Sequence, residues 1–284
     1  MRYLIVSDIH GNLPALEAIL ASPQAQTCER MISLGDQINC CPQSREVLLR
    51  LRALGATMLM GNHEERLRHL GEAAMSGYTW ALSHWTAKRI ADLPLELPID
   101  LRLGSVLCTH GAPGDPYRLL DPDSVAQVLG TLPPEITHML SGHRHVSWLV
   151  KAHGRIALNA GAAGSAHTCG SGLAPFAILD MDEEHIALEQ HRARYDVMDV
   201  ACAFIDTGCA AEAPEACRHV MQNLLTGEDT NLGHLVRHVH AVAKAHALDP
   251  DDAGTWALAD RSFPWVEAGV DSVRYWWEME KRLM

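Results

Sequence analysis

Five short clusters of polar residues in this 284-residue sequence contain side chains of the kinds that bind divalent metal ions. Each cluster lies beside a glycine and follows a short apolar run. Two divalent ions about 3.5–4 Å apart can polarise a phosphoryl oxygen and activate water, and they need oxygen and imidazole ligands. The clusters therefore predict a binuclear metal site. Its candidate ligands are Asp8, His10, Asp36, Asn62, His110, His143 and His145.

The apolar runs before the clusters have the length of buried strands. Residues 3–6, 31–34 and 56–60 form such runs, and apolar residues recur at helical spacing after the first two. Repeated alternation of strand and helix indicates an α/β layer with a partly parallel sheet. Functional residues of such sheets gather at the carboxyl ends of the strands, which is where Asp36 and Asn62 stand.

The second half of the chain is richer in strands, with helices mainly in the first half. We expect a helix over 78–93 and another near 124–129. Strands are expected over 95–101, 105–109, 137–140, 146–150, 155–158, 175–179 and 185–190. This order predicts an α/β protein built as a four-layer α/β/β/α sandwich.

From about residue 197 the pattern is helical again. Residues 1–195 are expected to form the main domain, and residues 196–284 a C-terminal helical extension packed on it. Two apolar stripes in the extension fit packing on the main domain, with a dimer contact or a lid over the site as alternatives. One stripe includes Leu235 and Val239, and the other includes Trp265, Trp276 and Trp277.

Charge and cysteine content argue against several classes of protein. Lysine and arginine number 23 against 35 aspartates and glutamates, and the net charge of −12 opposes non-specific binding to nucleic acid or anionic membranes. No apolar stretch reaches the ~18 residues of a membrane span. The first expected strand leaves no room for a signal peptide, and the eight scattered cysteines fit reduced thiols. We therefore expect a cytoplasmic protein.

At these clusters the sequence resembles the calcineurin-like metallophosphoesterase superfamily, whose motifs run D-x-H, G-D, G-N-H-[E/D], H and G-H-x-H. All five motifs occur here in that order, and the resemblance covers residues 1–195. The runs S-D-I-H-G-N and H-G-A-P look closest to the YfcE-like bacterial and archaeal phosphodiesterases. The resemblance implies the metallo-dependent phosphatase fold and a hydrolase of phosphoesters.

The resemblance also implies a role for each ligand. One ion would be held by Asp8, His10, Asp36 and His145, and the second by Asp36, Asn62, His110 and His143. A hydroxide bridging the two ions would attack phosphorus, and His63 would protonate the leaving oxygen or stabilise the transition state. Manganese is the expected metal, while iron, zinc and nickel are compatible with the same ligands.

The second motif departs from that of related serine/threonine phosphatases. Their G-D-x-V-D-R-G has an aspartate that orients the catalytic histidine and an arginine that clamps phosphate. Here Asn39 and Cys40 take those positions. Asn39 could still accept a hydrogen bond from His63, but a dianionic phosphate loses a bidentate guanidinium partner. This change favours monoanionic phosphodiesters.

Together these features predict a metal-dependent phosphodiesterase that acts on a small phosphoester. Asn39, Arg144 and His167 are the candidates for substrate binding. A dinucleoside polyphosphate hydrolase and a phosphomonoesterase are alternatives, and a non-enzymatic Vps29-like scaffold is a more distant one. The C-terminal helices could also join two copies of the chain. The natural substrate is not readable from the motifs.

Overall fold

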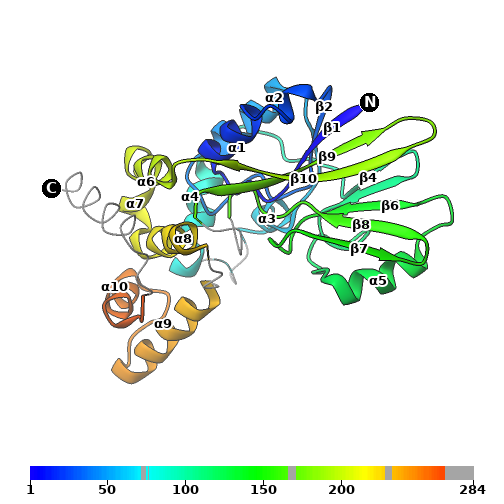
Figure 1. Cartoon of the computed structure of the whole chain (residues 1–284). Coiled ribbons are helices and arrows are strands. Elements are labelled where there is room, and N and C mark those ends of the chain that lie inside the picture. Colours follow the sequence, from blue (N-terminus) through cyan, green and yellow to red (C-terminus); the bar gives the residue numbers. More distant parts are fainter. Residues whose placement is uncertain (72–74, 76, 166–170, 228–231, 266–284) are drawn as a thin grey trace.

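The computed structural model of the chain describes residues 1–71, 75, 77–165, 171–227 and 232–265. Its centre is a pair of five-stranded sheets (Figure 1). The first sheet has the order β10-β9-β1-β2-β3, with β1 (Arg2–Val6), β2 (Arg30–Ser33), β3 (Thr57–Met58), β9 (Leu173–Met181) and β10 (Ile186–Arg194). The second has the order β4-β5-β6-β8-β7, with β4 (Asp100–Leu103), β5 (Val106–Thr109), β6 (His138–Ser141), β7 (Trp148–Ala152) and β8 (Arg155–Asn159).

Both sheets are mixed, and their parallel strands carry the polar clusters. Strand β1 runs parallel to β2, and β2 runs parallel to β3. In the second sheet, β5, β6 and β8 are parallel. Because parallel strands end at the same edge of a sheet, the loops after β1, β2, β3, β5 and β6 can meet.

The two sheets enclose one hydrophobic core, and helices cover their outer faces. Ile5 and Ile32 from the first sheet pack with Leu140 and Leu158 from the second. Helices α1 (Leu13–Leu20) and α2 (Ser44–Ala53) lie over the first sheet, and α5 (Pro122–Thr131) lies under the second (Figure 1). The predicted four-layer α/β/β/α sandwich is confirmed.

Capping residues fix the helices that follow the polar clusters. The Asn12 side chain accepts a hydrogen bond from the Ala15 N–H at 3.0 Å, and Pro14 lies in the first turn of α1. Both features favour a helix start. Leu16 and Ile19 then point into the core. The turn that carries Asp8 and His10 is therefore held between a buried strand and a capped helix.

Two predicted elements differ from the structure. Residues 95–99 are not in a strand, and β4 begins only at Asp100. Pro94 and Pro98 lack the N–H that a sheet ladder needs, so the apolar run there cannot pair as a strand interior. The helix predicted over 78–93 is a 3-10 turn, η3 (Tyr78–Trp80), followed by α4 (Ala81–Ile90).

The C-terminal helices pack in two groups. Helices α6 (Val197–Asp206), α7 (Cys209–Glu212) and α8 (Pro214–Thr226) share a hydrophobic cluster with β9 and α1. Helices α9 (Leu232–His246) and α10 (Ala253–Ser262) form a smaller cluster. In it, Leu235 and Val239 contact Trp256, and Tyr78 packs at its edge.

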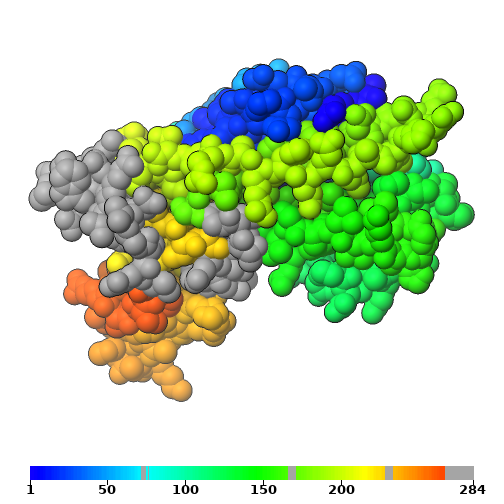
Figure 2. Space-filling model, viewed as in Figure 1, coloured from blue at the N-terminus to red at the C-terminus, as the bar shows by residue number. Residues whose placement is uncertain are grey.

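Helices α9 and α10 stand apart from the α5 side of the sandwich (Figure 2). The division at residue 195 stays a prediction, and Trp276 and Trp277 lie outside the described residues. No described helix has both the length and the apolar composition required to cross a membrane. Two further helical segments within the described residues are the 3-10 turn η1 (Ala25–Thr27) and α3 (Asn62–Leu67).

Candidate metal centre

The seven side chains predicted to bind metal ions, called the donors below, lie together at the ends of five strands. Asp8 and His10 follow β1, Asp36 follows β2, Asn62 follows β3, His110 follows β5, and His143 and His145 follow β6. Their backbone is unusual, because Asp8, His10, Asp36, His143 and His145 all have φ between +52° and +62°. Such left-handed conformations are uncommon outside glycine, and they turn the chain sharply at each strand end.

The first group of donors contains Asp8, His10, Asp36 and His145, whose ligand atoms all lie within 4.8 Å of one another. Nε2 of His10 is 3.1 Å from Nε2 of His145, and Oδ1 of Asp8 is 3.2 Å from the same His145 nitrogen. Oδ1 of Asp8 is buried and makes no hydrogen bond of good geometry with the described residues. A cation would satisfy this oxygen and both facing nitrogens.

The second group contains Asp36, His110 and His143, again within 4.8 Å. Nε2 of His110 lies 3.4 Å from Oδ2 of Asp36 and 3.1 Å from Oδ1 of Asn62. Asn62 therefore adjoins this group through its amide oxygen. Asp36 belongs to both groups, which is the geometry that a bridging carboxylate requires.

Each aspartate uses one oxygen to fix its position and presents the other to the imidazoles. Oδ2 of Asp8 accepts hydrogen bonds from the Ser7 hydroxyl at 2.5 Å and the His143 N–H at 3.0 Å. Oδ1 of Asp36 accepts one from the His63 N–H at 2.8 Å. The remaining oxygens, Oδ1 of Asp8 and Oδ2 of Asp36, face the imidazole nitrogens.

Glycines allow the close approach of these loops. A Cβ on Gly61 would lie 2.1 Å from Oδ1 of Asp36, and a Cβ on Gly142 would lie 1.8 Å from the Ser7 hydroxyl oxygen. Both distances are far below contact, so only glycine fits at either position. The donor types, their burial and this close packing fit two divalent ions.

Glu64 organises the Asp36 loop, a role that the sequence did not reveal. Its buried carboxylate accepts hydrogen bonds from the N–H groups of Asp36, Gln37, Ile38 and Gly61 at 2.8–3.2 Å. Its position three residues after Gly61, at the start of a helix, is a signal that could have found it. Glu64 thus ties α3 to the loop after β2.

His63 lies beside both donor groups and is oriented by Asn39. The amide Nδ2 of Asn39 donates to Nδ1 of His63 at 2.9 Å and to the Ser83 hydroxyl at 3.0 Å. The expectation that Asn39 accepts a hydrogen bond from His63 is therefore reversed. Since Nδ1 accepts, the neutral ring carries its proton on Nε2, which lies 3.9 Å from Oδ2 of Asp36.

Burial keeps two of the imidazoles uncharged. It lowers the pKa of His10 to about 4 and the pKa of His63 to about 3, although Asp36 opposes both shifts. Burial also lowers the pKa of His110, but Asp36, together with Asp8 and Glu64, raises that pKa to about 9. A neutral imidazole has the free lone pair that a metal ligand needs.

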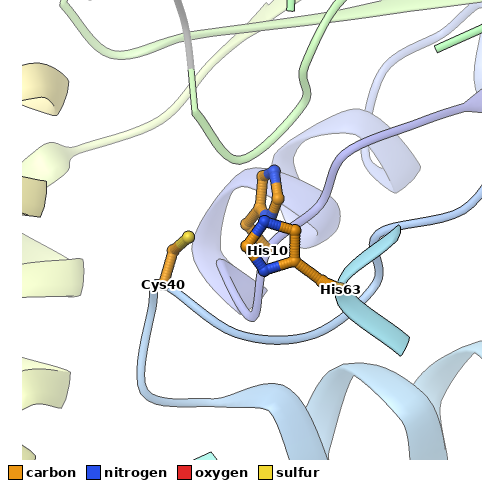
Figure 3. Close-up of side chains that lie close together, drawn as sticks. All are labelled: His10, Cys40 and His63. Atoms are coloured by element: carbon orange, nitrogen blue, oxygen red, sulfur yellow. The ribbon is translucent and has the colours of Figure 1, made fainter. Parts of the chain in front are cut away.

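Cys40 occupies the position of the absent arginine and points at His10 and His63 (Figure 3). Its sulfur and one nitrogen of each ring lie within 4.8 Å of one another. Burial, with a smaller contribution from Asp36, raises the pKa of the Cys40 thiol to about 12. A neutral thiol replaces a cation here, so this position offers no charge to a phosphate.

A cavity of about 550 Å³ adjoins the donors. Asn39 and Arg144, two of the predicted substrate-binding residues, line it, with Arg144 exposed at its edge. His167, the third, lies outside the described residues. Arg66 and several residues of α8 also line it, and sequence reasoning had assigned no role to them.

Comparison with known proteins gives matches over much of the chain. A family model described as calcineurin-like phosphoesterase matches residues 1–154, which contain all seven donors. Among curated proteins, the uncharacterized protein MJ0912 of Methanocaldococcus jannaschii is 24% identical over 218 residues, which are 68% of this chain and 87% of that protein.

Two solved structures share the fold over most of the chain. A metallophosphoesterase from Sphaerobacter thermophilus has a TM-score of 0.65 and 25% identity, covering 80% of this chain and 100% of that one. The hypothetical protein PH1004 from Pyrococcus horikoshii has a TM-score of 0.65 and 17% identity, covering 80% and 98%. The YfcE-like assignment within the superfamily stays a prediction.

Proposed function

Because the chain belongs to the calcineurin-like phosphoesterase family, we propose that it is a metal-dependent phosphodiesterase acting on small phosphoesters. Membership of the family implies a hydrolase of phosphoesters. The observation that carries the finer proposal is the pair of donor groups that share Asp36. We assign one ion to Asp8, His10, Asp36 and His145, and the second to Asp36, Asn62, His110 and His143.

The metals supply the main chemistry of this proposal. Two divalent ions bound by these donors would act as Lewis acids on the phosphoryl oxygens and lower the pKa of water towards neutrality. Manganese is our first choice, with iron, zinc and nickel as alternatives. A cytoplasmic location, as expected from the sequence, is part of the proposal.

The chain itself supplies the proton for the leaving oxygen. Asn39 donates to Nδ1 of His63, so the proton on Nε2 faces the donor groups. A general acid in this position can protonate an alkoxide as it departs.

A diester suits the charges around His63 better than a monoester. Cys40 adds no positive charge where the related phosphatases have an arginine. A dianionic monoester, which profits most from a bidentate guanidinium, therefore lacks that partner at this position, whereas a singly charged diester depends on it less.

Hydrolysis of bis(p-nitrophenyl) phosphate and p-nitrophenyl phosphate would test the proposal. We expect manganese-dependent turnover with a higher kcat/KM for the diester, abolished by a chelator and by Asp36→Asn. The matched control is Asp123→Asn, an exposed aspartate on α5, which should retain activity. Absence of turnover by metal-replete protein on both esters would refute the proposal.

A further inference from the structure

The cavity beside the donors extends well beyond the space that a phosphate needs. It reaches from His63 and His143 to helices α8 and α9, over a volume of about 550 Å³. Cavities of roughly 300–1,000 Å³ accommodate organic ligands the size of a nucleoside or a drug. Its far wall presents the apolar side chains of Leu82, Ala216, Val220 and Val236, with the polar His219 and Asn223 beside them on α8. The cavity thus has a polar end at the donors and a more apolar end at the C-terminal helices.

Arg66 lies where it can bind an anion between these two ends. It follows Asn62 by four residues and His63 by three on α3, so it shares their face of the helix. Its guanidinium carbon lies 5.5 Å from the ring centre of Trp80, which also lines the cavity. Among the described residues, no carboxylate forms an ion pair with Arg66, whereas Arg68 pairs with Glu65 at 3.0 Å.

The cavity wall formed by α8 is joined by a hydrogen bond to the 3-10 turn η3, which carries Trp80. The Tyr78 hydroxyl donates to Oε2 of Glu215 on α8 at 2.8 Å, and the Tyr78 N–H donates to the Asp251 carbonyl at 3.3 Å. The Tyr78 ring also packs against Trp256 of α10 at 5.5 Å between centroids. Tyr78 and Trp80 are two residues apart in η3. This turn therefore connects Trp80, which lies against the Arg66 guanidinium, to α8.

We propose that the cavity binds the organic group of a phosphodiester of nucleoside size, and that Arg66, held against Trp80, binds its phosphate. This inference rests on the proposed phosphodiesterase function. Arg66 supplies the planar two-pronged donor that is absent at Cys40, and it approaches the phosphate from a different side. Val220 and Val236 supply the apolar contact for the ester group. The extension thereby becomes part of the substrate site.

Binding of two phosphonates to the manganese-loaded protein, measured by calorimetry, would test this inference. One is the AMP analogue with a methylene in place of the 5′ oxygen, and the other is methylphosphonate. We expect the wild-type protein to bind the AMP analogue at least about tenfold more tightly, because only that ligand fills the apolar end. Arg66→Ala should weaken both ligands by about tenfold or more, since it removes a charge-assisted hydrogen bond.

Val220→Trp tests the apolar end of the cavity independently of the phosphate-binding end. It should weaken the AMP analogue by about tenfold while leaving methylphosphonate within about twofold, because the added ring occupies only the apolar end. Val236→Trp on α9 should do the same, and it provides a second test where Val220→Trp perturbs folding. Arg68→Ala, at the C-terminal cap of the same helix and paired with Glu65, should bind both ligands like the wild type.

Two results would overturn the inference. One is equal affinity of the wild-type protein for the two phosphonates, and the other is wild-type affinity for both in Arg66→Ala. Turnover of bis(p-nitrophenyl) phosphate is measured separately on the same samples. Absence of turnover would contradict the proposed function, while the binding data would still decide the role of the cavity.

Discussion

At the scale of single residues, the pairing of Asn39 with His63 decides how the proposed acid works. An aspartate at residue 39 would accept a hydrogen bond from the Nδ1–H of the histidine, whereas the amide donates to Nδ1 and leaves the proton on Nε2. The chain therefore presents a neutral imidazole to the leaving oxygen. Ser83 accepts the second hydrogen of the same amide and holds it in this orientation.

Asn39→Ala should lower kcat by roughly 10- to 100-fold for a diester with an alkoxide leaving group, such as a dinucleoside monophosphate, part of what general acid catalysis contributes. The effect on bis(p-nitrophenyl) phosphate should be smaller, because nitrophenolate leaves without a proton. Metal content should stay the same because Asn39 is not among the seven donors. Steady-state kinetics and elemental analysis of the same samples would check this. Ser83→Ala, which leaves the Asn39–His63 contact in place, should have a smaller effect. An unchanged kcat of Asn39→Ala for the diester with the alkoxide leaving group would exclude the orienting role.

Glu64→Gln should lower the free energy of unfolding by about 2–4 kcal/mol, since the new amide NH₂ faces backbone N–H groups and leaves them unpaired. Urea unfolding of the metal-free protein would measure this. The neighbouring Glu65 is part of a half-exposed pair with Arg68, so Glu65→Gln should change stability by only about 0.5 kcal/mol. Equal stability of the two variants would contradict the role of Glu64.

At the scale of elements, the sequence predicted the strands that carry the donors because each combines an apolar run with a glycine turn. It failed at residues 95–99, where the run is apolar but prolines prevent pairing. The donors Asp8, His110 and His145 were found for the same reason, as polar residues within four positions after the end of a strand. Arg66 was missed because its role depends on Trp80 and α8, which are distant from it in sequence.

Tyr78→Phe tests the connection between η3 and α8. Loss of the hydroxyl leaves the buried Glu215 carboxylate without this donor, so the free energy of unfolding should fall by about 1–3 kcal/mol. Thermal unfolding followed by circular dichroism would measure it. Tyr117→Phe is the matched control, because Tyr117 is exposed and should tolerate the change. A Tm equal to that of the wild type would show that the hydrogen bond does not hold the two elements together.

At the scale of the whole molecule, the fold brings donors from both sheets to one place, so metal binding and folding should be linked. Five of the donors lie between residues 8 and 110, after β1, β2, β3 and β5, and two lie in the loop after β6. The unfolded chain cannot hold them within a few ångströms. Ions should therefore bind the folded state preferentially and stabilise it.

Manganese should raise the Tm of chelator-treated protein in a concentration-dependent way. When the free manganese concentration is about a hundredfold above Kd, the free energy of unfolding should increase by about 2.7 kcal/mol for each ion. Differential scanning fluorimetry would follow it. Asp36→Asn should lose most of the gain because Asp36 belongs to both donor groups, while Asp123→Asn should keep it. A Tm that does not respond to manganese in the wild type would contradict the assignment of the donors.

The left-handed backbone of the donor loops limits how the site could be transplanted. Of the nine non-glycine residues with positive φ in the described chain, seven lie in or beside these loops. Each such conformation costs on the order of 1–3 kcal/mol, so a short peptide with the same sequence would adopt other backbone conformations. Hydrogen bonds such as Asp8 N–H to the Gly35 carbonyl and His10 N–H to the Asp36 carbonyl hold it here. A designer who moves this centre to a new scaffold must move the strand ends with it.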